Sequence, residues 1–89
     1  MYTYEIVPSL QDILKKLSKK DKQLYERVLK KIEEIINDAD VEHYKNLRYG
    51  LKDKKRVHVG HFVLIFSFVQ EENKIKFLDF DHHDQVYLG

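Results

Sequence analysis

The chain has no cysteine. This absence excludes disulfide bonds and thiolate metal sites, and it is typical of proteins in a reducing cytoplasm, where we expect this chain to act. No apolar run approaches the roughly 20 residues that a membrane-spanning helix needs, and the N-terminus lacks the basic region and apolar stretch of a signal peptide. Internal repeats, low-complexity segments and linkers are also missing. We therefore expect a single domain covering residues 1–89.

Net charge is nearly absent, since its formal value at pH 7 is +1. Its distribution is uneven, however. The first 56 residues hold 14 Lys and Arg against 10 Asp and Glu, a net of +4, whereas residues 57–89 hold 2 against 5, a net of −3. The basic excess in the first part of the chain is compatible with a bound polyanion and equally with a solvent-exposed lysine face.

Several common catalytic motifs are missing as well. Gly50 and Gly60 are isolated, so no glycine-rich phosphate loop is present, and no Ser–His–Asp arrangement is discernible. A metal site would have to use the run DFDHHDQVY near the end of the chain. The adjacent His82 and His83 point to opposite sides of an extended chain and do not easily bind one ion, which leaves a metal site as the weaker alternative. We expect no metal and no other cofactor.

What the sequence does contain is two kinds of periodicity. Residues 1–7 alternate as a strand, which Pro8 ends. Ser9 with Asp12, and Ser18 with Asp21, match the pattern of helix-starting caps. Two helices joined by almost no loop are predicted from apolar residues at helical spacing, namely Leu10, Ile13, Leu14 and Leu17 in the first and Leu24, Val28, Leu29, Ile32, Ile35 and Ile36 in the second.

The second half of the chain is rich in β-branched and aromatic residues. Residues 43–55 are expected to form a loop, followed by one strand on each side of a turn or bulge at Gly60, a polar hairpin turn at VQEENK, and a last strand over residues 74–80. The order β-α-α-β-β-β predicts an α+β fold of two layers, in which an N-terminal helical hairpin packs on an antiparallel sheet.

The strand before Gly60 carries the first candidates for chemistry. Side chains two apart on a strand share a face, so Arg56 and His58 point together while Lys55, Val57 and Val59 point to the other side. Because the helices need an apolar surface, the two valines should face them. Arg56 and His58 are then expected on the open face of the sheet.

The end of the last strand carries the other candidates. If the last three strands pair as a meander, His82, His83 and Tyr87 come near the open face. A guanidinium, several imidazoles and a phenol suit RNA cleavage, in which a base deprotonates the 2′-hydroxyl, a cation stabilises the phosphorane and an acid protonates the leaving 5′-oxygen. Taken singly, each of these residues is better explained by a purely structural role, and only the cluster as a set favours catalysis.

Three stretches of the chain, in their order and spacing, resemble the RelE/ParE superfamily of toxins from type II toxin–antitoxin modules, and RelE in particular. They are LKKLSKKDKQLYERVLKKIEEI, LRYGLKDKKRVHVGHFVLIFSF and DHHDQVY, and the resemblance covers nearly the whole chain. It implies a RelE-like fold and a ribosome-dependent mRNA interferase that enters the A site and cuts the codon by 2′-hydroxyl attack. It also implies a RelB-like antitoxin as partner, promoter DNA bound only through that antitoxin, and no membrane partner.

The active positions of the family carry over unevenly. Arg56 and His58 match a basic strand pair and Tyr87 matches the terminal tyrosine, whereas arginines of the family fall on Val63 and His83. The resemblance implies that Arg56 stabilises charge, that His58 and His83 share the roles of base and acid, and that Tyr87 positions the substrate. Further contacts with RNA are expected from Lys52, Lys54, Lys55, His82, Lys19, Lys20, Lys30 and Lys31.

Two other functions remain open on the sequence. A ParE-like inhibitor of DNA gyrase would share the fold without needing this catalytic set. A non-catalytic binding module would use the helical hairpin and the open sheet only to dock a protein. The terminal cluster DHHDQVY favours the nuclease over the gyrase inhibitor.

Overall fold

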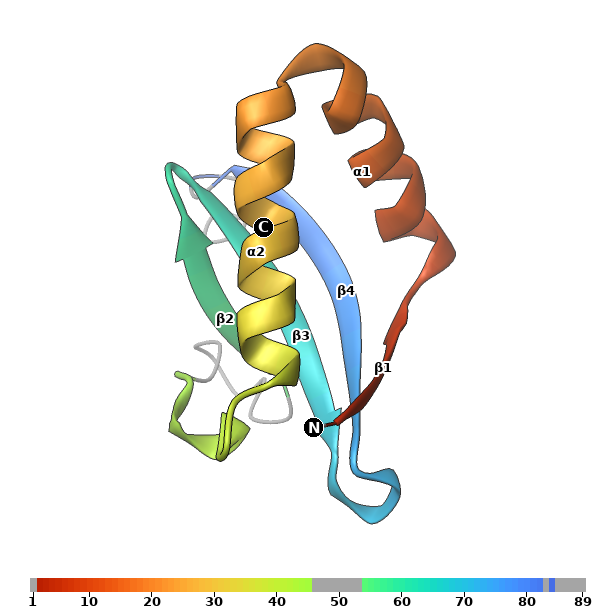
Figure 1. Cartoon of the computed structure of the whole chain (residues 1–89), viewed down its shortest axis with the longest axis vertical. Helices are drawn as coiled ribbons and strands as arrows, with labels where there is room; N and C mark the ends of the chain where they lie inside the picture. Colours follow the sequence, from red (N-terminus) through yellow and green to blue (C-terminus); the bar gives the residue numbers. More distant parts are fainter. Residues whose placement is uncertain (1, 46–53, 83, 85–89) are drawn as a thin grey trace.

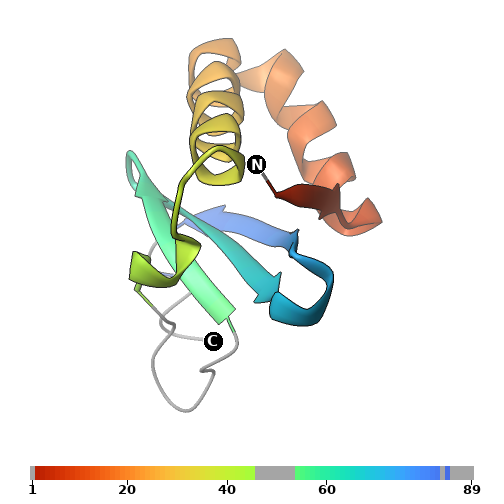
Figure 2. The same ribbon diagram turned by 60° about the horizontal axis from the view of Figure 1, so that its bottom comes forward.

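The structure is a computed structural model, and it describes residues 2–45, 54–82 and 84. Its elements are β1 (Thr3–Ile6), α1 (Pro8–Lys20), α2 (Lys22–Ile36), the 3-10 helix η1 (Val41–His43), β2 (Lys54–Val59), β3 (Phe62–Val69), the 3-10 helix η2 (Gln70–Glu72) and β4 (Lys74–His82). Both α-helices cover the same face of the sheet (Figure 1), as a view from another side also shows (Figure 2). The expected two-layer α+β fold with a helical hairpin on a sheet is confirmed.

The sheet has the strand order β1-β4-β3-β2. β2 pairs with β3 and β3 with β4 in antiparallel fashion, as the predicted meander requires. β1 pairs with β4 in parallel, so the sheet is mixed rather than wholly antiparallel. The helical hairpin and the meander separate β1 from β4 in the chain, and this long connection allows the parallel pairing.

The first helix begins without the expected serine cap. Its N-cap is Val7, whose side chain makes no capping hydrogen bond, and Pro8 occupies the first helical position. Proline suits that position because its fixed φ is helical. Its missing backbone N–H costs nothing there, since an N–H in the first turn has no acceptor within the helix. The cap predicted at Ser9 is therefore wrong, and proline accounts for the start of α1 instead.

A single residue, Asp21, separates the two helices. Its backbone N–H donates to the carbonyl of Leu17 and closes α1, while its carboxylate accepts a hydrogen bond of 3.1 Å from the backbone N–H of Leu24 and starts α2. The predicted cap at Ser18 is wrong, because Ser18 lies inside α1 and donates its hydroxyl to the Lys15 carbonyl. The tight hairpin follows from Asp21 serving both helices.

The core lies between the hairpin and the sheet. It consists of Leu10, Leu14, Leu24, Val28, Ile32, Ile35 and Ile36 from the helices, Val41 from η1, and Val59, Leu64, Phe66, Ile75, Phe77 and Phe80 from the sheet. Leu29, predicted in the apolar stripe of α2, is instead 39% exposed because it lies beside the stripe rather than on it. Within the described residues, neither helix is long and apolar enough to cross a lipid bilayer.

A bulge in β4 sets which of its side chains face the core. Phe77 and Phe80 are three residues apart, so regular alternation would place them on opposite faces, yet they are 0% and 4% exposed in the same core. The pairing with β3 explains this, since Ile65 lies opposite Asp79 and Phe66 lies opposite Phe77, which leaves Leu78 as an extra residue.

The turn between β2 and β3 consists of Gly60 and His61, since Val59 and Phe62 form the last pair of the ladder. Gly60 has a φ of +63°, which side chains disfavour and which the two-residue hairpin turns require. The guanidinium of Arg27 on α2 also lies against it, 3.3 Å from where a Cβ would stand. The turn predicted at Gly60 is thus confirmed.

Candidate functional site

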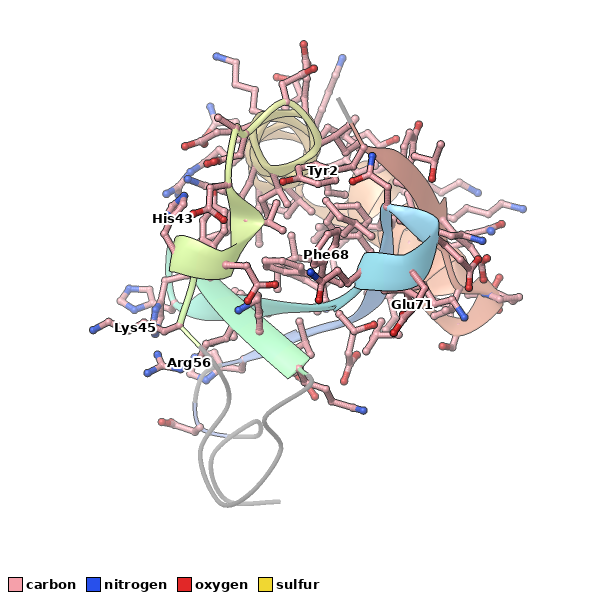
Figure 3. The ribbon with its side chains drawn as sticks, turned by 90° about the horizontal axis from the view of Figure 1, so that it is seen from below. Tyr2, His43, Lys45, Arg56, Phe68 and Glu71 are labelled. Atoms are coloured by element: carbon pink, nitrogen blue, oxygen red, sulfur yellow. The ribbon has the colours of Figure 1, made fainter. Side chains whose placement is uncertain are left out.

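The sheet turns one face toward the helices and the other away from them, and we call the second its outer face. Alternation places three side chains of β2 there, which we call the β2 row: Lys54, Arg56 and His58. Their partners through β3 give three side chains of β4, the β4 row: Lys76, Asp79 and Asp81. Arg56 projects on the side of the sheet away from the helices (Figure 3). The structure thus places Arg56 and His58 on the open face.

Between Arg56 and His58 on one side and Asp79 and Asp81 on the other, the outer face is apolar. Val63 and Ile65 of β3 are 0% and 8% exposed, although they belong to the outer face and not to the core cluster. Val63 lies directly opposite His58 on one side and Asp81 on the other. At this position the middle strand therefore supplies no charged group for a ligand.

Lys55 points to the opposite side from Arg56 and is buried. Its ammonium group donates a hydrogen bond of 3.2 Å to the Tyr44 carbonyl and lies 4.0 Å from a carboxylate oxygen of Glu42. The phenol of the same Tyr44 is partly buried, and this burial, together with the negative charges of Asp38 and Glu34, raises its pKa to about 12. Lys55 therefore binds η1 to the sheet, and its charge is held within the protein.

The open end of the sheet has a pocket of about 320 Å³ around the β2–β3 turn. It is lined by His58, Gly60, His61, His82 and Asp84. His58 comes from β2, His61 from the turn and His82 from the end of β4. The structure therefore brings the described part of the C-terminal cluster to His58, whereas His83, Tyr87 and Lys52 lie outside the described residues.

Contacts on two sides orient the His82 ring. The ring meets Phe62 edge to face, with centroids 5.4 Å apart. Its Nδ1 accepts a hydrogen bond of 3.3 Å from the backbone N–H of Asp84, and a carboxylate oxygen of Asp84 lies 3.8 Å away. With Nδ1 as acceptor, the neutral ring carries its proton on Nε2, which can donate a hydrogen bond. Within the described residues, no group of His, Asp and Glu is arranged to hold a metal ion.

The predicted helical lysines lie elsewhere. Lys19 and Lys20 are exposed in the last turn of α1, and Lys30 is exposed on α2. Lys31 forms an ion pair of 2.9 Å with Glu34 on its own helix. These lysines belong to the helical layer and are not among the residues that line the pocket.

A larger groove of about 510 Å³ runs between the helical hairpin and the sheet. Its apolar lining comes from Ile13, Leu17, Leu24, Phe62 and Phe80. Lys16 and Lys20 add positive charge, and Asp21 and Asp81 add negative charge. The groove suits an apolar occupant, whereas the chemistry expected from the sequence belongs to the smaller, imidazole-lined pocket.

Comparison with known families decides what kind of protein carries this site. The model of the ParE toxin of type II toxin–antitoxin systems matches residues 4–87. The chain belongs to this family of toxins. A protein of Methanocaldococcus jannaschii described as "Putative toxin RelE4" is 55% identical over 89 residues, which cover 98% of this chain and 92% of that protein.

Solved structures give the same fold. The isolated RelE toxin of E. coli superimposes with a TM-score of 0.75 at 17% identity, covering 92% of this chain and 84% of that one. RelE from the archaeal RelE–RelB complex of Pyrococcus horikoshii gives a TM-score of 0.69 at 22% identity, covering 91% and 93%. The predicted membership of the RelE/ParE superfamily is thus confirmed, and with it the RelE-like fold.

Sequence reasoning assigned no role to His61, which lines the pocket, or to Arg27, which lies against Gly60. A signal for His61 was available, because a two-residue turn at Gly60 brings the turn residue close to the strand ends that it joins. No comparable signal pointed to Arg27. Its contact with the turn depends on how α2 crosses the sheet, which the spacing of residues in the sequence does not specify.

Proposed function

We propose that the chain is the toxin of a type II toxin–antitoxin module and acts as a ribosome-dependent endoribonuclease. In this proposal it enters the A site and cuts the mRNA codon there. The observation that carries the proposal is the outer end of the sheet, where the β2 row leads into a pocket lined by imidazoles. Membership of the toxin family supports the inhibitory role, and the 55% identical relative described as "Putative toxin RelE4" supports the RelE branch.

The reaction would use the nucleophile that RNA carries. A base takes the proton of the 2′-hydroxyl, the 2′-oxygen bonds to phosphorus, the bond to the 5′-oxygen breaks, and an acid protonates that oxygen. The products are a 2′,3′-cyclic phosphate and a 5′-hydroxyl. Arg56 would stabilise the additional negative charge of the phosphorane, and His58 would serve as base or acid. His83 as the other of these two groups and Tyr87 as a positioning group stay predictions from the sequence.

The helical lysines would contact the ribosome. Lys19, Lys20 and Lys30 are exposed on the helical layer, and Lys54 lies in the β2 row. Phosphate contacts of this kind are independent of sequence and weaken as salt is raised. Lys31 would contribute less because it is paired with Glu34, and Lys55 is left out because its ammonium group is buried.

An antitoxin would be the partner in the cell. Structural relatives were solved as RelBE, RelE–RelB and YoeB–YefM complexes, which supports a RelB-like protein for this chain. A helix of such a protein would find apolar surface in the groove of about 510 Å³, and its acidic residues would cover the basic surface. Promoter DNA would be contacted through the antitoxin alone.

Translating ribosomes mixed with the protein test the proposal. Primer extension on the message should reveal cuts inside codons, and a chain with both His58→Ala and His83→Ala should give far fewer. Intact message together with DNA damage in arrested cells would instead support gyrase inhibition, the alternative that the ParE family name favours. Ribosome binding without cleavage at any pH would make the chain a binding module.

A further inference from the structure

The turn between β2 and β3 presents a histidine to the same pocket as His58 and His82. We propose that this pocket binds a phosphate group of RNA and that His61 is one of its ligands. The inference deepens the proposed function, on which it rests for the identity of the ligand. It adds a residue that the catalytic assignments above do not use.

Three separate elements bring the imidazoles together. His58 is on the outer face of β2, His61 is the second residue of the turn, and His82 lies opposite Phe62 at the end of β4. Because the strand ladder fixes β2, β3 and β4 relative to one another, these three residues line one space of about 320 Å³ at the end of the sheet. The His82 ring approaches it from the Phe62 side of β4, and His58 from the outer face of β2. A pocket of this size is within the range of small-ligand sites, and it can enclose a phosphate group with part of its nucleoside.

The lining chemistry favours an anion. An imidazole offers N–H donors, and it becomes a cation near neutral pH. His82 is held so that Nδ1 meets the Asp84 backbone N–H and Nε2 remains the donor nitrogen of the neutral ring. Asp84 is the one carboxylate among the described lining residues, and one of its oxygens lies 3.8 Å from His82 Nδ1.

The turn itself is held firmly and beside a further positive charge. The Arg27 guanidinium of α2 packs against Gly60, so close that a Cβ there would stand 3.3 Å from Nη1. His61 follows Gly60 directly, and its backbone position is therefore set both by the hairpin and by α2. None of the described lining residues is Lys or Arg, so among these residues the three histidines supply the side-chain donors for a phosphate.

Titration of the full chain with two probes tests the inference. The probes are inorganic phosphate and an RNA trinucleotide whose cleavage-site sugar lacks the 2′-hydroxyl and so cannot react. Ring resonances of His58, His61 and His82 should move together in NMR spectra. His43 provides an internal control, because it is bonded to Asp38 and stacked on Tyr44 away from the pocket.

Variants measure the contribution of His61. His61→Ala should weaken trinucleotide binding about tenfold, the loss expected for one charge-assisted hydrogen bond. His61→Gln, which keeps a donor, should recover part of that loss, and His43→Ala should change binding less than twofold. Since His61 is exposed in a turn, the variants should keep the wild-type amide spectrum elsewhere. Unchanged binding by His61→Ala, or a His61 ring that does not respond while the other two do, would overturn the inference.

The same variants separate this inference from the proposed function. If the wild type cuts mRNA on ribosomes and His61→Ala cuts equally well with unchanged binding, the role of His61 is refuted while the nuclease stands. If the wild type cuts no message but the three pocket rings respond to the trinucleotide, the nuclease proposal is refuted and the phosphate site stands.

Discussion

The two outer rows of the sheet differ in charge although they lie on the same surface. The β2 row is made of Lys54, Arg56 and His58, whereas the β4 row has two carboxylates, Asp79 and Asp81, and one cation, Lys76. The buried Val63 and Ile65 of β3 separate Arg56 and His58 from the two carboxylates, and Ser67 lies between the two lysines. A polyanion on the outer face should therefore lie over β2 and the turn beyond it, and avoid β4.

The difference also arises from two kinds of backbone structure. On β2, plain alternation is enough to place the basic side chains outward. On β4, the extra residue Leu78 lets Phe77 and Phe80 both enter the core while Asp79 and Asp81 remain outside. The acidic side of the surface thus depends on a bulge, and the basic side does not.

The largest expected effect is the loss of Arg56. If the basic row stabilises the phosphorane, Arg56→Ala should lower the rate of codon cleavage on ribosomes by about 10²–10³, the range for removing one stabilising group from a transition state. Lys76→Ala removes a cation from the acidic row of the same face and is the matched control. Single-turnover primer extension measures both. Equal losses in the two variants would show that the two rows do not differ in function.

How far sequence reasoning reaches can be judged from these same strands. Alternation was sufficient to place Arg56 and His58 outward, because a strand in a two-layer fold has one face toward the helices. The bulge at Leu78 and the parallel pairing of β1 were not predictable, since both depend on how distant strands pair. Lys55 was correctly placed on the inner side, but its burial depends on η1, whose contact with β2 is not visible in local spacing.

The caps show a similar division. Asp21 was part of a predicted pattern, and its short side chain does cap α2. The caps predicted at Ser9 and Ser18 were wrong, because Pro8 starts the first helix and α1 continues past Ser18. At the site, His58 and His82 were candidates from the start, whereas His61 gained its importance only when the turn placed it in the same pocket.

The second-largest expected effect concerns the turn at Gly60, which follows β2. Gly60→Ala should lower the free energy of unfolding by about 1–2 kcal/mol, because alanine is strained at a φ of +63° and its methyl group would press on the Arg27 guanidinium. Urea denaturation measures the change. His61→Ala alters the neighbouring exposed position and should stay within about 0.5 kcal/mol of the wild type. If Gly60→Ala were as stable as the wild type, the turn would be able to adapt and would not be held in place by α2.

A smaller effect should come from the acidic row. Asp81→Asn removes one negative charge beside the pocket end of the sheet and should tighten binding of a short RNA about two- to threefold at low salt. Glu71→Gln removes the same charge from η2, at the opposite end of β4, and should leave binding unchanged. The gain should shrink as salt is added. A similar gain from both variants would point to net charge rather than to the division between the two rows.

The smallest expected effect concerns the segments that pack beside β2 and β4. β2 is joined to η1, where a hydrogen bond from His43 lowers the pKa of Asp38 below its ordinary value of 3.8. β4 is joined to β1, where the Lys74 ammonium, 2.8 Å from Glu5, lowers the pKa of that carboxyl below 4.5. Each carboxylate binds protons less readily in the folded chain, so its contribution is present above these values and is lost as pH falls through the lower folded pKa.

Acid denaturation of two variants should separate the contributions of these two segments. Asp38→Asn and Glu5→Gln should each flatten the loss of stability below about pH 4. The change should be small, because Glu5 is exposed and Asp38 is only half-buried. Amide exchange should then show where each loss falls, with Asp38→Asn loosening the segment that holds Lys55 and Glu5→Gln loosening the β1–β4 pair. If both variants increased amide exchange in the same strands, η1 and β1 would not stabilise separate parts of the sheet. The β2 and β4 sides of the outer face would then unfold together in acid.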